Sequence, residues 1–210
     1  MFRNIQCQIQ GVSPLIVHAP NTVNPRSPFT KELKNVTKKR NKSDEDIELI
    51  SKIEWLAGLY TSHSGEFLID GSDLIIEGFG HPIVPGVNVE ATLVEGAKKR
   101  KLGKTFKAAV MVPDDPAIAY PGAPLTVAEM AENCRFIDIQ KARVGTSSVM
   151  RCRPIFHDWS LTFTIMYEAE DVDFSSVAEA LKTAGRSVGL CDQRPRYGRF
   201  TVTHFEDCGE

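Results

Sequence analysis

The sequence predicts an α+β fold in which an antiparallel sheet carries helices on one face. Segments with a hydrophobic period of two and segments with a helical period both occur, in the order strand, helix, hairpin strands, helix, strand. The chain has 210 residues, of which 42% are hydrophobic and 25% are charged. Such a length and composition are sufficient for one well-packed core or for a core with large insertions.

The N-terminal segment is expected to form the first strand. Ile5, Cys7 and Ile9 alternate with glutamines, which is the pattern of a half-buried strand. Residues 19–43 begin with prolines and asparagines and continue as a basic run with few apolar side chains. This composition predicts a long mobile loop. Ser43, which precedes three acidic residues, is then expected to cap a helix.

The rest of the chain is assigned by the same periods and turn signals. Residues 67–76 predict a hairpin around Asp70 and Gly71. A second helix is expected to open at Pro85 and to run into Lys98–Lys101, where cations favour a helix C-terminus. Further strands are expected over residues 106–112, 135–144, 149–155, 159–167 and 200–205, a surface excursion over 114–133, and a short amphipathic helix over 174–181.

Arginine and lysine are strongly segregated along the chain. The formal net charge is only −2, yet residues 26–42, 98–107, 141–153 and 186–199 hold 21 of the 25 basic residues and two of the 27 acidic ones. Such separation creates local potentials that the net charge conceals. If the four stretches meet on one face, they form a groove for a polyanion, which favours nucleic acid as the partner.

The segment from 185 to 200 is the most informative basic stretch. Its three glycines allow close backbone approach, and its four arginines carry planar forks suited to phosphate. Phe200 is either a stacking ring for a base or a core residue beyond an exposed turn. The candidate nucleic-acid contacts in this segment are Arg186, Arg194, Arg196, Tyr197 and Arg199.

Two other stretches add candidates. Lys141, Arg143, Arg151 and Arg153 flank a small-residue tip, as in a basic two-stranded finger on which the arginines share faces. The alternative is a solvated two-stranded ribbon whose charged side chains prevent its edge from pairing with another strand. The run Lys98, Lys99, Arg100 and Lys101 is expected to add long-range attraction for phosphate, although a basic helix end is often a solvated terminus.

Signals for catalysis are sparse. The five histidines show no metal-ligand spacing, and no nucleotide-binding or hydrolase motif is present, so we expect neither a metal nor a cofactor. His18 is a candidate for a general base in metal-independent RNA cleavage, although a lone histidine is more often structural. The five cysteines include no C-x-x-C pair, and no apolar run approaches the roughly 20 residues that span a bilayer. A cytoplasmic protein without membrane contact is expected.

Three segments carry a resemblance to a known family. Residues 11–18 (GVSPLIVH), residues 83–97 (IVPGVNVEATLVEGA) and the segment from 185 to 200 resemble the opening, the turn-plus-helix and the glycine-rich loop of RAMP-superfamily proteins, which are backbone subunits of CRISPR effector complexes. Residues 189–200 read GLCDQRPRYGRF and are similar to a pattern at the end of uncharacterised phage and prophage proteins.

This resemblance implies a ferredoxin-like (RRM-like) antiparallel sheet within a single domain over residues 1–210. Insertions are expected at about residues 19–60, 114–133 and 138–156, the last a hairpin that resembles a thumb. The implied function is sequence-nonspecific binding of single-stranded RNA or DNA by a phage-encoded protein that multimerises along the strand as a homo-oligomer or filament. The alternatives are a metal-independent endoribonuclease and a phage assembly or host-interaction protein with an acidic protein partner.

Overall fold

The structure is a computed structural model, and it describes residues 1–144 and 147–209. The chain divides into two compact units. The first unit comprises Met1–Leu15, Ile83–Ala123 and Phe156–Glu210, and the second comprises Ile16–Pro82 and Pro124–Ile155. The chain thus leaves the first unit twice and returns to it each time. The description as one domain with insertions at 19–60, 114–133 and 138–156 stays a prediction.

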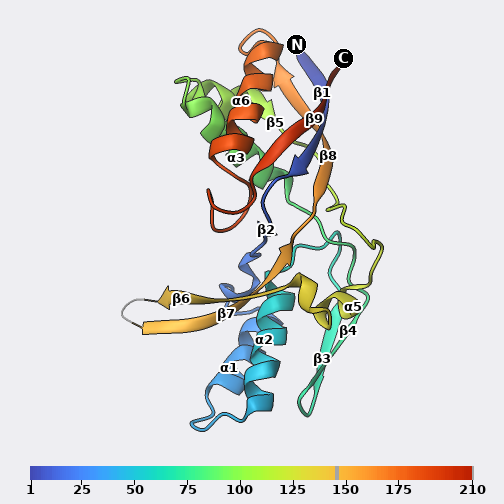
Figure 1. The fold of residues 1–210 in the computed structure, drawn as a ribbon, viewed down its shortest axis with the longest axis vertical. Helices are drawn as coiled ribbons and strands as arrows, with labels where there is room; N and C mark the ends of the chain where they lie inside the picture. The colour runs from blue at the N-terminus through green and yellow to red at the C-terminus, as the bar shows by residue number, and fades with distance from the viewer. Residues whose placement is uncertain (145–146, 210) are drawn as a thin grey trace. The chain divides into compact units, whose positions relative to one another are not determined.

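The first unit is a ferredoxin-like βαββαβ fold, which confirms the expected fold class. Its four-stranded antiparallel sheet has the order β5-β8-β1-β9, so the first strand lies in the middle, and α3 and α6 make the two crossovers. The chain termini lie at the same end of neighbouring strands (Figure 1). In chain order the elements are β1 (Phe2–Gly11), α3 (Gly86–Lys98), α4 (Gly103–Ala109), β5 (Val110–Met111), β8 (Ser160–Glu168), α6 (Phe174–Ser187) and β9 (Phe200–Gly209).

The period-two pattern of β1 sorts its side chains onto the two faces of this sheet. Ile5, Cys7 and Ile9 are buried, whereas the glutamines between them are exposed. Helices α3 and α6 cover one face of the sheet (Figure 1). They approach each other closely at Gly96, where an added Cβ would lie 2.4 Å from the carbonyl oxygen of Ala180. The other face carries the glutamines of β1 and, opposite them, Thr162 and Thr164 of β8 and His204 and Glu206 of β9.

One strand expected in this unit is mostly a helix. The strand predicted over 106–112 is instead α4, followed by the two-residue strand β5. Gly103, Phe106 and Ala109 are buried at every third position, which is a helical spacing. The short apolar run is compatible with both the strand period of two and the helical period of about 3.6 residues. Its packing in the folded unit favours the helix.

The second unit combines two helices, a hairpin and a small sheet. Its three-stranded sheet has the order β2-β7-β6, and β3 and β4 form a separate hairpin, as predicted. Helix α2 begins with the capping box that Ser43 and Asp46 form, which confirms the predicted cap. The elements are β2 (Leu15–Ile16), η1 (Pro20–Thr22), α1 (Pro28–Thr37), α2 (Asp44–Gly58), β3 (Glu66–Asp70), β4 (Asp73–Glu77), α5 (Val127–Ala131), η2 (Cys134–Phe136), β6 (Ile137–Val144) and β7 (Ser147–Phe156).

The basic segment 19–43 is not the mobile loop that its composition predicts. It contains α1, which begins at Pro28, in the first turn, where proline is tolerated. Phe29, Leu33 and Val36 recur at helical spacing and pack against Leu49 and Ile53 of α2. Two lysines of this stretch, Lys31 and Lys34, therefore lie on an amphipathic helix, and the other three follow it.

The expected surface excursion at 114–133 also contributes to the packing. Ile118 is 4% exposed, and Met130 of α5 is fully buried. Across residues 1–144 and 147–209, no helix has both the length and the apolar character needed to cross a membrane.

Candidate nucleic-acid interface

The four basic stretches meet in pairs, one pair in each unit. Residues 98–107 and 186–199 belong to the ferredoxin-like unit, and residues 26–42 and 141–153 belong to the second unit. Each pair brings cations together around a hollow in the surface. The two hollows are described in turn.

A groove of about 720 Å³ runs along α3 and α4 in the first unit. Its apolar lining includes Val87, Ala91 and Val94, which form a stripe along one side of α3. Two carboxylates also line it, but both are engaged: Glu90 accepts from the backbone N–H of Val112 at 2.8 Å, and Glu95 pairs with Lys98. The cations of the groove are Lys98, Lys101, Lys104, Lys107 and Arg194.

Lys101 occupies a backbone position that normally favours glycine. Its φ is +65°, in the left-handed region. The Lys101 N–H donates to the Lys98 carbonyl at 2.9 Å, and the Leu102 N–H donates to the Ala97 carbonyl at 3.1 Å. These two bonds form a Schellman motif, in which the left-handed residue is usually glycine. A lysine at this position carries backbone strain and places its charge at the groove.

The loop from 188 to 199 has a fixed backbone. The N–H of Leu190 donates to the Gly198 carbonyl at 2.9 Å, and the N–H of Gly198 donates to the Pro14 carbonyl at 2.8 Å. Gly198 has a φ of +69°, and an added Cβ would lie 2.0 Å from the carbonyl oxygen of Leu190. The glycines of this segment therefore serve close backbone contacts, as the sequence predicts. Leu190 itself is fully buried.

The aromatic residues of this loop differ in their environments. Phe200 is 3% exposed and meets Trp159 edge to face at 6.4 Å, so it belongs to the core and does not stack on a base. Tyr197 is half-buried, and the Arg196 guanidinium lies 5.9 Å from its ring centroid. The Arg199 Nε donates to the Pro195 carbonyl at 2.7 Å. Two of the loop arginines thus contact the loop itself.

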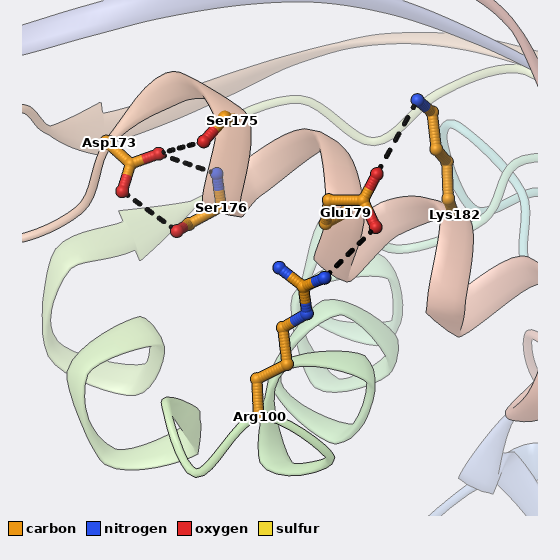
Figure 2. A network of polar contacts seen from close by, with 6 residues as sticks. All are labelled: Arg100, Asp173, Ser175, Ser176, Glu179 and Lys182. Carbon is orange, nitrogen blue, oxygen red and sulfur yellow. Dashed lines mark hydrogen bonds and ion pairs between the residues drawn. The ribbon is translucent and has the colours of Figure 1, made fainter.

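The remaining basic candidates of the first unit do not line the groove. Arg100 forms an ion pair at 3.4 Å with Glu179 of α6, and Glu179 also pairs with Lys182 (Figure 2). Lys99 and Arg186 are exposed, and Arg186 lies in the last turn of α6, where it complements the helix dipole. Arg100 therefore joins the turn after α3 to α6, in addition to any attraction for phosphate.

In the second unit, the register of β6 and β7 separates the predicted basic residues. Arg151 lies opposite Gln140 and Arg153 opposite Asp138, whereas Arg143 lies opposite Ser148. Residues directly opposite each other share a face, and the faces alternate along a strand. Arg151 and Arg153 therefore share one face, and Arg143 lies on the other with Lys141. The expectation that all three arginines share faces is wrong for Arg143.

The second hollow, of about 360 Å³, lies on the Arg151 side of this hairpin. His18, Lys34, Arg151 and Arg153 all line it. Arg151 forms an ion pair with Glu54, which is 7% exposed and also accepts from the Cys152 N–H at 3.0 Å. This buried carboxylate holds the Arg151 guanidinium group in place. The sequence candidates His18, Arg151 and Arg153 thus lie at one site.

Three thiols of the described chain are deactivated by burial, and one of them, Cys152, lines the second hollow. Burial raises the pKa of Cys7, Cys152 and Cys191 to about 12. Each of these thiols is therefore protonated at neutral pH. Over the described part of the chain, no three His, Cys, Asp or Glu side chains are grouped so that they could hold a metal ion.

Sequence reasoning missed two of the groove lysines, Lys104 and Lys107. The local signal was the spacing of Lys104 and Lys107, which lie three residues apart on α4. Positions three apart on a helix are neighbours on its surface. Reading residues 106–112 as a strand hid this pattern.

No protein-family model matches the sequence, and a search of curated proteins finds no match. Solved structures do match. One is the cryo-EM structure of the Type III-B Cmr-beta bound to cognate target RNA, at 11% sequence identity and a TM-score of 0.43. The match covers 98% of this chain and 60% of that chain, so this chain spans about three fifths of its length. Similarity at this level assigns neither a family nor a function.

Proposed function

We propose that this protein binds single-stranded nucleic acid without sequence preference, through the groove of the ferredoxin-like unit. The observation that carries the proposal is that five cations from two separate basic stretches line one groove along α3 and α4. Two carboxylates, Glu90 and Glu95, also line it, and Glu95 pairs with one of the five cations, Lys98. The groove therefore presents an excess of positive charge to a ligand.

The groove has the chemical character that a single strand requires. Backbone phosphates would lie along the lysines and Arg194, and bases would cover the apolar stripe of α3. Arg194 supplies a planar fork for phosphate, whereas the lysines act as point charges. Since none of the described residues that line the groove is aromatic, phosphate contacts would supply most of the affinity. Such contacts carry no sequence information.

The strain at Lys101 also favours a binding role. A left-handed non-glycine residue lowers stability by roughly 1 kcal/mol or more relative to glycine. Such strained residues are concentrated at ligand sites. Lys101 lines the groove, so its side chain gives a reason for the strain.

A salt titration with a labelled single-stranded oligonucleotide tests the proposal. We expect the Lys104→Gln/Lys107→Gln double variant to bind less tightly than the wild type at low salt. Its plot of log affinity against log salt should be shallower by roughly 1.4, since each lost phosphate contact removes about 0.7 for a single strand. The matched control is Lys99→Gln/Lys182→Gln, which removes two exposed lysines of the same unit outside the groove.

Absence of binding by the wild type at low salt would refute the proposal. Equal losses in the two double variants would show that attraction is diffuse and that the groove is no site. An acidic protein partner is the alternative reading of the same charge. Copurified nucleic acid, seen as a raised ratio of absorbance at 260 and 280 nm, would count against that alternative.

Multimerisation along the strand is part of the proposal, since a nonspecific binder of this type is expected to cover a strand with many copies. Negative-stain images with and without single-stranded nucleic acid test it. Rings or filaments that form with nucleic acid are the expected result. Isolated particles at saturating nucleic acid would limit the proposal to a monomeric binder.

A second candidate function, RNA cleavage without a metal, is favoured by the hollow of the second unit. There His18 lies with three cations that could hold a phosphate, and a histidine beside a held phosphate can act as a general base. Incubation of RNA with the protein in EDTA should then give fragments that the His18→Ala variant does not give. Intact RNA after incubation with the wild type would exclude this activity.

A further inference from the structure

The second unit contains a cleft that neither basic hollow explains. It has a volume of about 730 Å³, within the range usual for small-molecule sites. Three phenylalanines from separate segments line it: Phe29 of α1, Phe67 of β3, and Phe79 after β4. All three are half-buried although full burial would stabilise the fold. Partly exposed aromatic rings gathered in one cleft indicate a ligand site.

The rings are arranged as a stacking platform. Phe29 and Phe67 are stacked, with ring centroids 4.6 Å apart and an interplanar angle of 15°. Phe29 also packs against the core that α1 and α2 share, so the platform is anchored to the unit. Phe79 lies against Gly65, where an added Cβ would be 2.6 Å from its ring. Aromatic rings held in this way favour planar π-systems as ligands.

The wall of the cleft at residues 21–27 is held by hydrogen bonds. The buried Thr30 hydroxyl donates to the Asn24 carbonyl at 2.7 Å, and the Ser27 N–H donates to the same carbonyl at 3.0 Å. The Asn21 side chain donates to the Ala57 carbonyl at 3.1 Å. These contacts fix the backbone around the cleft before any ligand arrives, as in preformed ligand sites.

The charges in the cleft limit the ligand further. Arg26 lines it and is exposed, and within the described residues its guanidinium forms no ion pair. An arginine fork suits a phosphate. Glu66 also lines the cleft and can accept a hydrogen bond from an exocyclic amine of a base. A stacking platform, a phosphate-binding cation and an amine acceptor together match a nucleotide.

We propose that this cleft binds a nucleotide, with the base stacked on the phenylalanines and the phosphate at Arg26. The ligand is a base with an exocyclic amine that carries a 5′-phosphate, either as a free mononucleotide or as one nucleotide of a strand. The site is independent of the groove on the ferredoxin-like unit, because it shares no residue with it.

Calorimetric titration of the full chain with AMP, adenosine and ribose 5-phosphate tests the assignment. AMP should bind at one site per chain, and adenosine should bind more weakly because it lacks the phosphate for Arg26. Ribose 5-phosphate should bind at least about fivefold more weakly than AMP, since stacking contributes at least that factor per base. A 5′-phosphorylated trinucleotide forms the second arm. Tighter binding of the trinucleotide that Phe67→Leu weakens assigns the cleft to a strand, and tighter binding of AMP assigns it to a free nucleotide.

Three variants separate the parts of the site. Phe67→Leu retains apolar volume but removes a ring, and it should weaken AMP by about fivefold or more. Arg26→Gln should weaken AMP but leave adenosine unchanged. Arg40→Gln is the matched control, because Arg40 is an exposed arginine of the same basic stretch outside the cleft. Thermal unfolding of each variant verifies that the unit remains folded.

The assignment is overturned if neither AMP nor the trinucleotide binds, or if ribose 5-phosphate binds as tightly as AMP. It is also overturned if a folded Phe67→Leu protein binds AMP as the wild type does. Loss of AMP binding in Lys104→Gln/Lys107→Gln would assign the ligand to the groove instead. Failure of that groove variant to alter oligonucleotide binding, with AMP still bound at the cleft, would refute the proposed function alone.

Discussion

Arg194 reaches from the loop before β9 to α3, where its Nη1 lies 3.5 Å from the Oγ1 of Thr92. Thr92 is 1% exposed, and its hydroxyl donates to the Gly189 carbonyl at 3.3 Å. One buried threonine on the helix thus contacts both the loop backbone and the loop arginine. This contact places Arg194 in the same groove as the lysines of α3 and α4.

Replacing this hydroxyl tests how firmly the loop is attached. Thr92→Val leaves the Gly189 carbonyl without its donor, so we expect the free energy of unfolding to fall by about 1 kcal/mol. Urea denaturation measures this change. Thr162→Val on the exposed sheet face is the control, and it should alter stability little. Equal stability of the two variants would show that the Thr92 hydroxyl does not hold the loop.

Two strands of the ferredoxin-like unit could be predicted because their signals are local, whereas its topology was expected only from the resemblance to RAMP-superfamily proteins. Ile5, Cys7 and Ile9 alternate with polar residues in β1, and apolar and polar residues also alternate along β8. The cap at Ser43 is a local signal as well. Helix α1 was missed because charge dominated its segment, although Phe29, Leu33 and Val36 already had helical spacing.

The composition of the sites depended on facts that a single sequence does not contain. Whether Arg143 and Arg151 lie on the same face depends on whether the turn between their strands has an odd or an even number of residues. A shift of one residue in the strand pairing moves every side chain of a strand to the opposite face. Likewise, Arg194 is 87 residues from Lys107 in the chain, and only the packing of the loop against α3 brings both to one groove. Phe29, Phe67 and Phe79 meet for the same reason.

Lys101 gives a prediction in which stability and binding change in opposite directions. Lys101→Gly relieves the left-handed strain, so the free energy of unfolding should rise by roughly 1 kcal/mol. The same change removes a cation from the groove and should weaken oligonucleotide binding. Lys101→Ala is the control, because it loses the charge but keeps the strain. If Lys101→Gly bound oligonucleotide as tightly as the wild type, the strained lysine would have no role in binding.

Gly198 should tolerate no side chain. Gly198→Ala combines a positive φ with overlap against the Leu190 carbonyl oxygen, and we expect it to lower the free energy of unfolding by roughly 3 kcal/mol. Gly122→Ala is the matched control. Its φ is +88°, but an added Cβ meets nothing within 4 Å, so only the backbone strain of about 1 kcal/mol should appear. Similar losses in both variants would mean that the loop relaxes around the new methyl group.

Asp173 gives the protein a stability contribution that depends on pH. Its carboxylate accepts from Ser175 and Ser176 at the start of α6, and these bonds lower its pKa to about 2 (Figure 2). Because the pKa is lower in the folded state, the contribution is fully present above the unfolded value near 4 and is lost as the pH falls through about 2.

Asp173→Ala should therefore lower the free energy of unfolding by roughly 1 kcal/mol at neutral pH, as for the loss of an N-cap. The difference from the wild type should shrink between pH 4 and pH 2. Denaturation over this range measures it, with Asp171→Ala, an exposed acidic residue outside the cap, as the control. A difference that stayed constant down to pH 2 would show that the Asp173 charge does not contribute and that the variant acts through helix propensity alone.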